Sequence, residues 1–503
     1  METESLVNQS NMKGANMAAG TFLFENKLRP GCYVPIKGVP SANSNMSERG
    51  TVVVMMNADS GGLVTEISAN DILTGSSAAK GFPTSAFSDT KGLLNYVYQY
   101  VNKIIICRLN NGGQKAYAYL IGSEDSEDSL SARAKYSGLF GNSLSVAIVK
   151  EASGEGKFKG NGWFIRTSVV NSDGGKEVVE EQNLKELASL KSNDYVDFLI
   201  SGEPTLVAVA SKDLTGGTNG EEGGQNLTKI FAQITDMQWN TAAYCGKDEN
   251  ASLFVSFIKN LRENLGKYRQ GVVYCGRAVA TADYEGIISP YQLFVVDDDD
   301  YEEISELYEK ESPTADEKKE IALRRNMAVC YVASITAGAD VNISNTYSAL
   351  PQNVTAVVPS PYEDEDVEDD LSKGRLMFTK NSSGTLVVEK DINTLHTYTQ
   401  TRTEPFSKNR VIRCLDELSN TKVKIWESMF IGKIDNNATG RNLFKTQIMK
   451  IMQNMQNIGA LRDVGSADIV VEQGDSVDTV RSFESVRPVD AMERLYSYVT
   501  VLG

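Results

Sequence analysis

Few residues in this sequence have the types and spacing that catalysis requires. The 503 residues contain one histidine, His396 in DINTLHTYT, so any Cys-His or Ser-His-Asp mechanism would depend on that side chain alone. A lone histidine in a strand-like context is more often structural or exposed. The segment TGSSAAKGF (Thr74 to Phe82) has glycines and a lysine, but not the GxxxxGK[ST] order of a phosphate-binding loop. The sequence therefore predicts no catalytic residue and no cofactor.

Two acidic stretches are the candidates for a metal site. DDDDYEE covers Asp297 to Glu303, and EDEDVEDD covers Glu363 to Asp370. Neither has the spaced ligands and the glycine of a calcium loop, and DNNATG (Asp435 to Gly440) has Thr446 where the closing glutamate would stand. We interpret both stretches as solvated surface and expect no metal site. Neutralising Asp297 to Asp300 is therefore expected to change solubility and salt sensitivity only.

Composition excludes several classes of partner. Asp and Glu total 66 against 50 Lys and Arg, so the net charge of −16 does not favour nonspecific binding to nucleic acid or anionic membrane. The six cysteines show no CxxC or metal spacing, which is typical of reduced core thiols in a protein folded in a cytosol. No window approaches the ~18 apolar residues of a membrane span. The polar start METESLVNQSNMKG is also not typical of a secretory signal.

Hydrophobic periodicity predicts an alternation of strands and helices around these residues. In the segment NASLFVSFIKNLRENLGK, apolar Leu253, Phe257 and Leu261 recur every four residues behind a capping Asn250, and Gly266 ends the helix. A turn at Asn111-Gly112-Gly113 predicts a hairpin into KAYAYLIG. The other predicted elements are strands at Thr51 to Met56, Ile104 to Leu109, Trp239 to Cys245 and Gly271 to Gly276, and helices at Lys91 to Lys103 and Gly440 to Leu461.

The pattern changes between Glu124 and Glu222. SLSVAIVK, WFIRTSVV, KEVVE and YVDFLI are short β-rich runs separated by turn residues, with one short helix predicted at NLKELASL. The far edge, Leu214 to Asn226, is glycine-rich like a linker. Because α/β alternation resumes afterwards, the sequence predicts a mixed α/β (α+β), multi-domain fold in which a layered α/β core is interrupted by a β-rich insertion domain.

Each end of the chain contains a strand-like run. RLYSYVTVLG (Arg494 to Gly503) alternates apolar and polar residues, and TFLFENKLRPGCYVPI (Thr21 to Ile36) is extended around a Pro-Gly turn. Such strands present backbone donors and acceptors that must pair somewhere. Two alternatives are open: pairing within the same subunit, or donation of the strand to a neighbouring subunit.

Eight ordered segments then carry a resemblance to a known family. They are NKLRPGCYV, ERGTVVV, AKYSGLFGN, ITAGADVN, VVEKDINTLHTYT, FSKNRVIRCLDE, IGKIDNNATGRNLFK and PVDAMERLYSYVTV. In this order, over nearly the whole chain, the sequence resembles contractile tail sheath proteins, especially those of myophage-like prophages and phage-tail bacteriocins of Gram-positive bacteria. It departs from that pattern in a longer polar segment before Thr21 and in the acidic stretch Asp297 to Lys319.

The resemblance implies a structural subunit of a contractile tail sheath and no enzyme. Such subunits polymerise as stacked hexameric rings around a tail tube and contract to drive the tube through a target cell envelope. Each subunit lends its terminal strands to neighbours. The implied arm residues are Phe22, Leu23, Phe24, Leu28, Tyr33 and Val34 at the N-terminus and Leu495, Tyr496, Tyr498, Val499 and Val501 at the C-terminus. For Arg441, Lys445 and Lys450 two alternatives are open: side chains that face the tube, or a solvated helix face.

The resemblance also implies partners, a location and a division of the chain. The partners are further copies of the chain, a tail tube protein, and baseplate and tail terminator proteins, without nucleic acid or direct membrane insertion. The protein is expected in the bacterial host cytoplasm and, after lysis, in a virion or tail-like particle. The expected parts are an N-terminal tail and arm (1–36), an α/β domain in two parts (37–123 and 223–400), a β-rich insertion (124–222), an inner sheath domain (401–490) and a C-terminal arm (491–503).

Two other functions stay open at this point. A static self-assembling shell or surface-layer protein would use the same exchanged strands with only one packing. A soluble metal-dependent enzyme would use the acidic stretches or His396.

Overall fold

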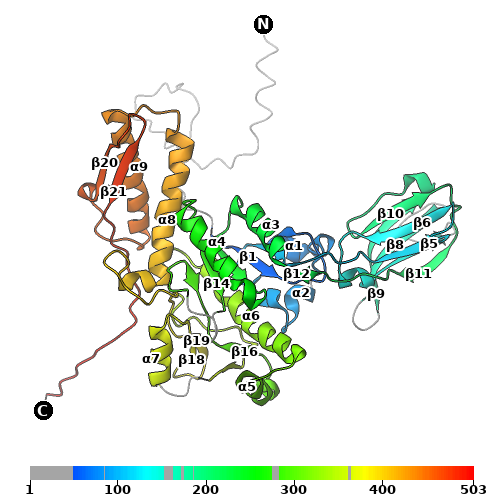
Figure 1. Cartoon of the computed structure of the whole chain (residues 1–503), viewed down its shortest axis with the longest axis horizontal. Coiled ribbons are helices and arrows are strands. Elements are labelled where there is room, and N and C mark those ends of the chain that lie inside the picture. Colours follow the sequence, from blue (N-terminus) through cyan, green and yellow to red (C-terminus); the bar gives the residue numbers. More distant parts are fainter. Residues whose placement is uncertain are drawn as a thin grey trace, which may run out of the picture. The chain divides into compact units, whose positions relative to one another are not determined.

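The computed structural model describes residues 49–83, 85–151, 162–170, 175–184, 186–274, 282–360 and 364–502 (Figure 1). These residues belong to one compact unit, Ser47–Gly503. The predicted N-terminal arm, Phe22 to Val34, lies outside the described residues, as do Cys32 and Cys275. The mixed α/β, multi-domain fold class is confirmed, because the described residues form helices together with several separate β-sheets.

A six-stranded sheet forms the centre of the α/β core, in the order β15-β14-β13-β1-β3-β2. The first five strands are parallel to one another, and β2 pairs antiparallel with β3. The strands predicted at Thr51 to Met56 and Ile104 to Leu109 are confirmed as β1 and β3, within one residue. The bounds are β1 (Thr51–Met56), β2 (Val64–Ser68), β3 (Lys103–Arg108), β13 (Thr241–Tyr244), β14 (Gln270–Val273) and β15 (Ile287–Ile288).

Both faces of this sheet are covered, so its central strands are continuously apolar. Side chains alternate along β1. Val52 and Val54 belong to a core shared with α6, whereas Val53 and Met55 belong to a second core shared with α3 and α4. The helices are α1 (Ala69–Thr74), α2 (Ser85–Ser88), α3 (Gly224–Thr235), α4 (Ala251–Glu263), α5 (Tyr301–Glu309), α6 (Ala315–Gly338), α7 (Asp364–Ser372), α8 (Asn409–Ile425) and α9 (Ala438–Asn457).

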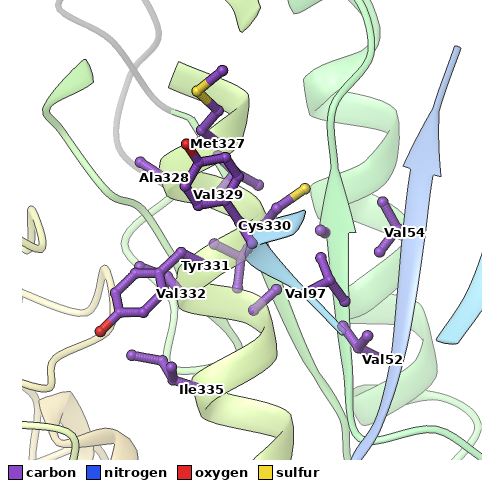
Figure 2. Packing of buried hydrophobic residues seen from close by; sticks show 14 of the residues in the cluster. Val52, Val54, Val97, Met327, Ala328, Val329, Cys330, Tyr331, Val332 and Ile335 are labelled. Atoms are coloured by element: carbon purple, nitrogen blue, oxygen red, sulfur yellow. The ribbon is translucent and has the colours of Figure 1, made fainter. Parts of the chain in front are cut away.

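Helix α6 is buried on all sides along its second half, from Arg324 to Ala337. Figure 2 shows Cys330 of this helix in the same cluster as Val97 and the β1 residues Val52 and Val54. On another side of α6, the Tyr331 ring lies 5.9 Å from Phe294 and 6.4 Å from Phe378, measured between ring centroids. A helix without a polar stripe is typical of the interior of a large core, so α6 joins the central sheet to the residues that come after it.

Two small sheets stand beside α6. β16 (Leu293–Val295) pairs with β17 (Ala356–Val358), and β18 (Phe378–Lys380) pairs with β19 (Leu386–Val388). Phe294 and Phe378, one from each sheet, lie 5.2 Å apart and share the core with α6. The α/β core therefore extends well beyond the central sheet.

The strands between β4 and β12 form two antiparallel sheets around a core of their own, which includes Ala116 and Leu214. One sheet has the order β10-β6-β5 and the other the order β11-β7-β8-β9. The bounds are β4 (Asn110–Asn111), β5 (Tyr117–Ile121), β6 (Ser129–Ala134), β7 (Leu144–Glu151), β8 (Gly162–Val170), β9 (Lys176–Leu184), β10 (Val196–Ser201), β11 (Val209–Asp213) and β12 (Glu221–Glu222).

The helix predicted over Lys91 to Lys103 was wrong. The segment forms a short 3-10 helix, Leu93–Tyr96, followed by turns. Leu94, Tyr96 and Val97 are all at most 2% exposed, so the segment is buried on several sides rather than along one helical stripe. Burial against α6 therefore decides its conformation and overrides the apparent helical period.

The hairpin predicted at Asn111-Gly112-Gly113 was also wrong, because β4 pairs with β12 and β5 pairs with β6. The segment Leu214 to Asn226 is not a free linker either. A Cβ atom on Gly220 would lie 1.7 Å from the Asn111 carbonyl oxygen, so glycine is needed for this close approach. The Asn226 amide also donates to the carbonyls of Arg108 and Leu109, at 2.9 and 2.7 Å.

Helix α4 was predicted in the right place with one error in its buried face. Leu253 is 48% exposed, and the neighbouring Phe254 is fully buried instead. Asn250 precedes the helix but makes no capping bond, because its amide donates to Glu222 Oε1 at 3.2 Å. At NLKELASL only a 3-10 turn forms, over Leu187–Ser189.

We predict that Phe378→Ala destabilises the folded chain by about 3–5 kcal/mol, because it removes a fully buried ring that contacts both Phe294 and Tyr331. Phe483→Ala is the matched control, since that ring is 55% exposed. Denaturant unfolding of both variants, followed by circular dichroism, measures the difference. Equal midpoints for the two variants would contradict this description of the core.

Candidate assembly interface

The C-terminal part of the chain is built on helices α8 and α9, which pack against each other. A five-residue π-helix, Trp426–Phe430, follows α8 directly. Trp426, Phe430 and Phe444 of α9 form an aromatic cluster with centroid separations of 4.8 to 5.5 Å. The cluster fixes the connection between the two helices, so that α9 presents a firm base for the strands that pack on it.

A two-stranded hairpin of β20 (Ile469–Gln473) and β21 (Val480–Glu484) comes after α9 and is drawn in red beside it in Figure 1. Ile469 is completely buried, whereas the cross-strand pair Val470 and Phe483 is 49% and 55% exposed. Within the described residues no third strand joins this hairpin. Both outer edges therefore present unpaired backbone groups, next to one apolar face.

After β21 the chain remains attached to its own subunit for about ten residues. The Arg462 amide donates to the Arg487 carbonyl at 3.0 Å, and the Val489 amide donates to the Ala460 carbonyl at 2.9 Å. Glu493 is the last attached residue: its carboxylate pairs with Lys408 Nζ and accepts a hydrogen bond from Thr346 Oγ1 at 3.1 Å.

Beyond Glu493 the chain runs on as an extended segment without secondary structure (Figure 1). Residues 494–502 form no hydrogen bond or ion pair with any other described residue. The five predicted arm residues all point to solvent: Leu495, Tyr496, Tyr498, Val499 and Val501 are 89%, 77%, 94%, 82% and 88% exposed. Pairing of this segment with its own subunit, one of the two alternatives, is not observed in the described part of the chain.

The three predicted tube-facing residues lie on α9. Arg441 and Lys445 are one helical turn apart and therefore share a face, while Lys450 is further along the helix. All three are partly exposed. Arg441 donates to the carbonyl and the side-chain oxygen of Asn436, at 3.2 and 2.9 Å, so part of its hydrogen-bonding capacity serves the helix start. Their contact with a tube stays a prediction.

The acidic stretches begin or form helices, α5 and α7, and one carboxylate among them has a structural role. Asp300 Oδ2 lies 2.6 Å from Arg324 Nη2 and 3.5 Å from Lys91 Nζ. Its hydrogen bond from Arg324, a residue only 1% exposed, lowers the pKa of Asp300. The expectation that Asp297 to Asp300 act alike as solvated surface was therefore wrong for Asp300. Across the described residues, no group of three or more His, Cys, Asp or Glu side chains could hold a metal ion.

His396 is part of a local turn. Its backbone amide donates to Asp283 Oδ1 at 2.9 Å, and its ring Nδ1 lies 2.9 Å from the Thr394 carbonyl. Asp283 has a left-handed backbone, with φ of 42°, and its side chain also accepts the amide of Thr397. These contacts explain the histidine as a structural residue.

Sequence reasoning missed the attachment at Glu493 and the hairpin at β20 and β21. The only local signal for Glu493 was in PVDAMERLYSYVTV, where Glu493 and Arg494 precede the alternating run that begins at Leu495. Its partners, Lys408 and Thr346, lie 85 and 147 residues away, and no local pattern predicts such contacts.

None of the helices in the described part of the chain combines the length and the apolar character that a membrane span requires.

Two family models match the chain and together span more than half of it. The phage tail sheath protein central domain matches residues 220–394, and the phage tail sheath C-terminal domain matches residues 401–501. The phage-like element PBSX protein XkdK of Bacillus subtilis is 26% identical over 512 residues, which cover 96% of this chain and 100% of that protein.

Solved structures give the same match. The sheath tail protein of Desulfitobacterium hafniense superposes with a TM-score of 0.69 at 29% identity, covering 93% of this chain and 99% of that chain. A sheath tail protein of Listeria innocua superposes with a TM-score of 0.68 at 23% identity, covering 89% and 93%, and shows the shared fold.

We predict that Asp300→Asn lowers the melting temperature by about 2–4 °C at neutral pH, because it leaves the buried Arg324 with Glu320 alone. The control, which replaces Asp297, Asp298 and Asp299 together by Asn, should leave the melting temperature unchanged. Since the pKa of Asp300 is lowered from its ordinary value of 3.8, its stabilisation is complete above about pH 4 and is lost as the pH falls through the lowered pKa. A difference between wild type and variant that persists fully below that range would contradict the assignment.

Proposed function

Because this chain belongs to the phage tail sheath family, it is a structural subunit of a tail sheath, and we propose that its copies polymerise as stacked hexameric rings around a tail tube. The assembled sheath contracts and drives the tube through the envelope of a target cell. The observation that carries this proposal is the C-terminal segment beyond Glu493, which makes no hydrogen bond or ion pair with the other described residues and exposes a row of apolar side chains.

The segment has the pattern of a strand that needs a partner. Leu495, Val499 and Val501 fall on one side of an extended chain, and Tyr496 and Tyr498 fall on the other. Burying each such side chain is worth about 1.5–3 kcal/mol, so leaving all of them in water is unfavourable whenever a neighbour can cover them. The segment beyond Glu493 therefore acts as the free part of the predicted arm, residues 491–503, and pairs with another copy.

The β20–β21 hairpin is the surface that accepts an arm. An added strand would satisfy the backbone groups along one hairpin edge, as in other complexes formed by strand addition. It would also bring side chains beside the exposed pair Val470 and Phe483. A hairpin of two strands gains most from such an addition, because sheets of three or more strands are the stable form. In the same way, Phe22 to Val34 serves as the N-terminal arm of each subunit.

Contraction is then a rotation of whole subunits between two packings. Ladder hydrogen bonds involve only backbone groups, so the arms remain paired while the short segments next to them bend. The domain of residues 401–490 faces the tube, with Arg441, Lys445 and Lys450 toward it, and the β-rich insertion faces outward. The free energy is stored in assembly, and no nucleotide is consumed during contraction.

The remaining partners are those that this role requires. A baseplate protein and a tail terminator protein contact the two ends of the sheath. The chain is made in the cytoplasm of a bacterial host and leaves it in a virion or tail-like particle after lysis. Neither nucleic acid nor direct membrane insertion is part of the mechanism.

We predict that deleting Leu495 to Gly503 abolishes polymerisation while the subunit still folds. The deleted residues contribute no buried side chain to their own subunit, so the melting temperature and the circular dichroism spectrum should be unchanged. Electron microscopy and size-exclusion chromatography measure polymer formation. The substitution Val499→Pro should have the same effect with one residue, because proline removes a backbone donor from the strand.

Two results would contradict this mechanism. Truncated subunits that still build full-length sheaths would show that the arm is not donated. Truncation that unfolds the isolated subunit would show that the segment belongs to its own core. Particles that polymerise but keep one length after heating or mild denaturant would instead identify a static shell.

A further inference from the structure

Residues 336–346, which are the last residues of α6 and the segment after it, contact two distant parts of the chain. Arg49, just before β1, donates to the Thr336 carbonyl at 2.9 Å and to the Ala339 carbonyl at 2.6 Å. Further along the same segment, Thr346 donates to Glu493. Arg49 and the root of the C-terminal arm are therefore both held by residues 336–346.

A buried ion pair between Asp391 and Arg413 binds this segment. Asp391 and Arg413 are 2% and 1% exposed, and Asp391 Oδ2 lies 3.0 Å from Arg413 Nη2. Asp391 Oδ2 also accepts the backbone amide of Asn345 at 2.9 Å, and its own amide donates to Thr346 Oγ1 at 3.0 Å. Its other oxygen accepts the side-chain amide of Asn409 at 2.8 Å. Asp391 thus connects the segment to the first turns of α8.

Burial, together with the nearby charge of Arg413, lowers the pKa of Arg49 to about 10. Each guanidinium donates to carbonyl oxygens of the same segment: Arg49 to Thr336 and Ala339, and Arg413 to Ile343. Arg413 also pairs with the buried Asp391. Loss of these bonds would leave the carbonyl oxygens and Asp391 without these donors, which is costly, so the bonds hold residues 336–346 in place. We name Arg49, Thr336, Ala339, Thr346, Asp391, Lys408, Asn409, Arg413 and Glu493 the arm-root junction.

Five of the eight segments that resemble sheath proteins contribute to this junction. They are ERGTVVV through Arg49, ITAGADVN through Thr336 and Ala339, VVEKDINTLHTYT through Asp391, FSKNRVIRCLDE through Lys408, Asn409 and Arg413, and PVDAMERLYSYVTV through Glu493. Segments far apart in sequence thus contact one another in one polar cluster. Together they hold the root of the C-terminal arm, which no single segment could do.

We propose that Lys408 and Thr346 hold Glu493 and so attach the root of the C-terminal arm to the same buried cluster that holds Arg49. Glu493 is a positioning residue for strand donation. The cluster keeps the position of the arm root constant with respect to the subunit body, while the residues after Glu493 are free to bend. This inference rests on the proposed function, because a fixed root matters only for an arm that reaches another copy.

Spin labels test this clasp, the hold of Lys408 and Thr346 on Glu493, in the monomer, without any sheath. A background with Cys32→Ser and Cys275→Ser leaves only the buried native thiols, and single cysteines are placed at Met492, which is fully exposed, and at Ser497. We expect the label at position 492 to be immobilised and the label at 497 to be mobile. In Glu493→Gln and in Lys408→Met, the label at 492 should become several-fold more mobile, while the label at 497 does not change.

The double variant separates a clasp from two unrelated effects. If Lys408 and Glu493 act through each other, the double variant should match either single one rather than add their effects. Asp236→Asn is the matched control, because it removes a carboxylate whose ion pair with Lys267 is on the surface of the α/β core. It should leave both labels unchanged. A label at 492 that is as mobile as the label at 497 in the parent protein would overturn the proposal.

The same variants then test the consequence for assembly. Glu493→Gln should raise the subunit concentration needed for half-maximal polymerisation by about tenfold, which corresponds to 1.4 kcal/mol. Its melting temperature should remain near that of the parent. Unchanged polymerisation together with a loosened label would overturn the positioning role. A parent protein that never polymerises, with the label contrast intact, would refute the proposed sheath function and not the clasp.

Discussion

The structure depends on one constraint: the backbone groups and apolar side chains of residues 494–502 have no partner among the other described residues of their own subunit. Val499 and Val501 are more than 80% exposed, whereas valines such as Val52, Val53 and Val146 are completely buried in the cores of the described chain. The β20–β21 hairpin shows the complementary deficiency, with two open edges and an exposed Phe483. Under the proposed function, one copy that supplies a strand to another would remove both deficiencies together.

A donated strand is useful only if the body that donates it is stiff. The central sheet is covered on both faces, and α6 is buried on all sides between that sheet and the aromatic residues Phe294 and Phe378. The Arg262 guanidinium binds both oxygens of Asp416 at 2.6 and 2.8 Å, which ties α4 to α8. Breaking a buried pair of this kind costs about 3–5 kcal/mol. Rotation of whole subunits is therefore easier than deformation within one.

The sequence predicts those elements whose conformation is determined by their own residues. TVVVMM is a strand because its β-branched residues fit a sheet buried on both sides, and that cause acts within six residues. The segment at Lys91 to Lys103 failed because its tyrosines and valines are buried on several sides by α6, which is more than 200 residues away. The hairpin at Asn111 failed for a similar reason, since its partner Glu221 comes after the entire β-rich insertion.

In the candidate interface too, local features could be predicted from the sequence and long-range contacts could not. The alternation of Leu495 to Val501 is visible in the sequence, and its exposure follows from the absence of a strand to pair with in the described chain. The attachment at Glu493 is invisible, because Thr346 and Lys408 come from distant segments. Likewise the acidic run DDDDYEE does not reveal which carboxylate is structural, since only the position of the buried Arg324 distinguishes Asp300 from its neighbours.

An exposed apolar segment can associate nonspecifically with other copies of the chain. The net negative charge of the chain opposes such contacts. A net charge of −16 makes two copies repel each other at long range, so contact through the arm alone is opposed. Pairing becomes favourable only where the arm and the rest of the subunit are covered at the same time, because the apolar gain must exceed that repulsion. In the proposed assembly, a fixed position of the arm root restricts the relative orientations in which this can occur. If ordering of the arm is coupled to binding of another copy, the stability of the arm rises with subunit concentration, and the strand forms as part of the assembly rather than before it.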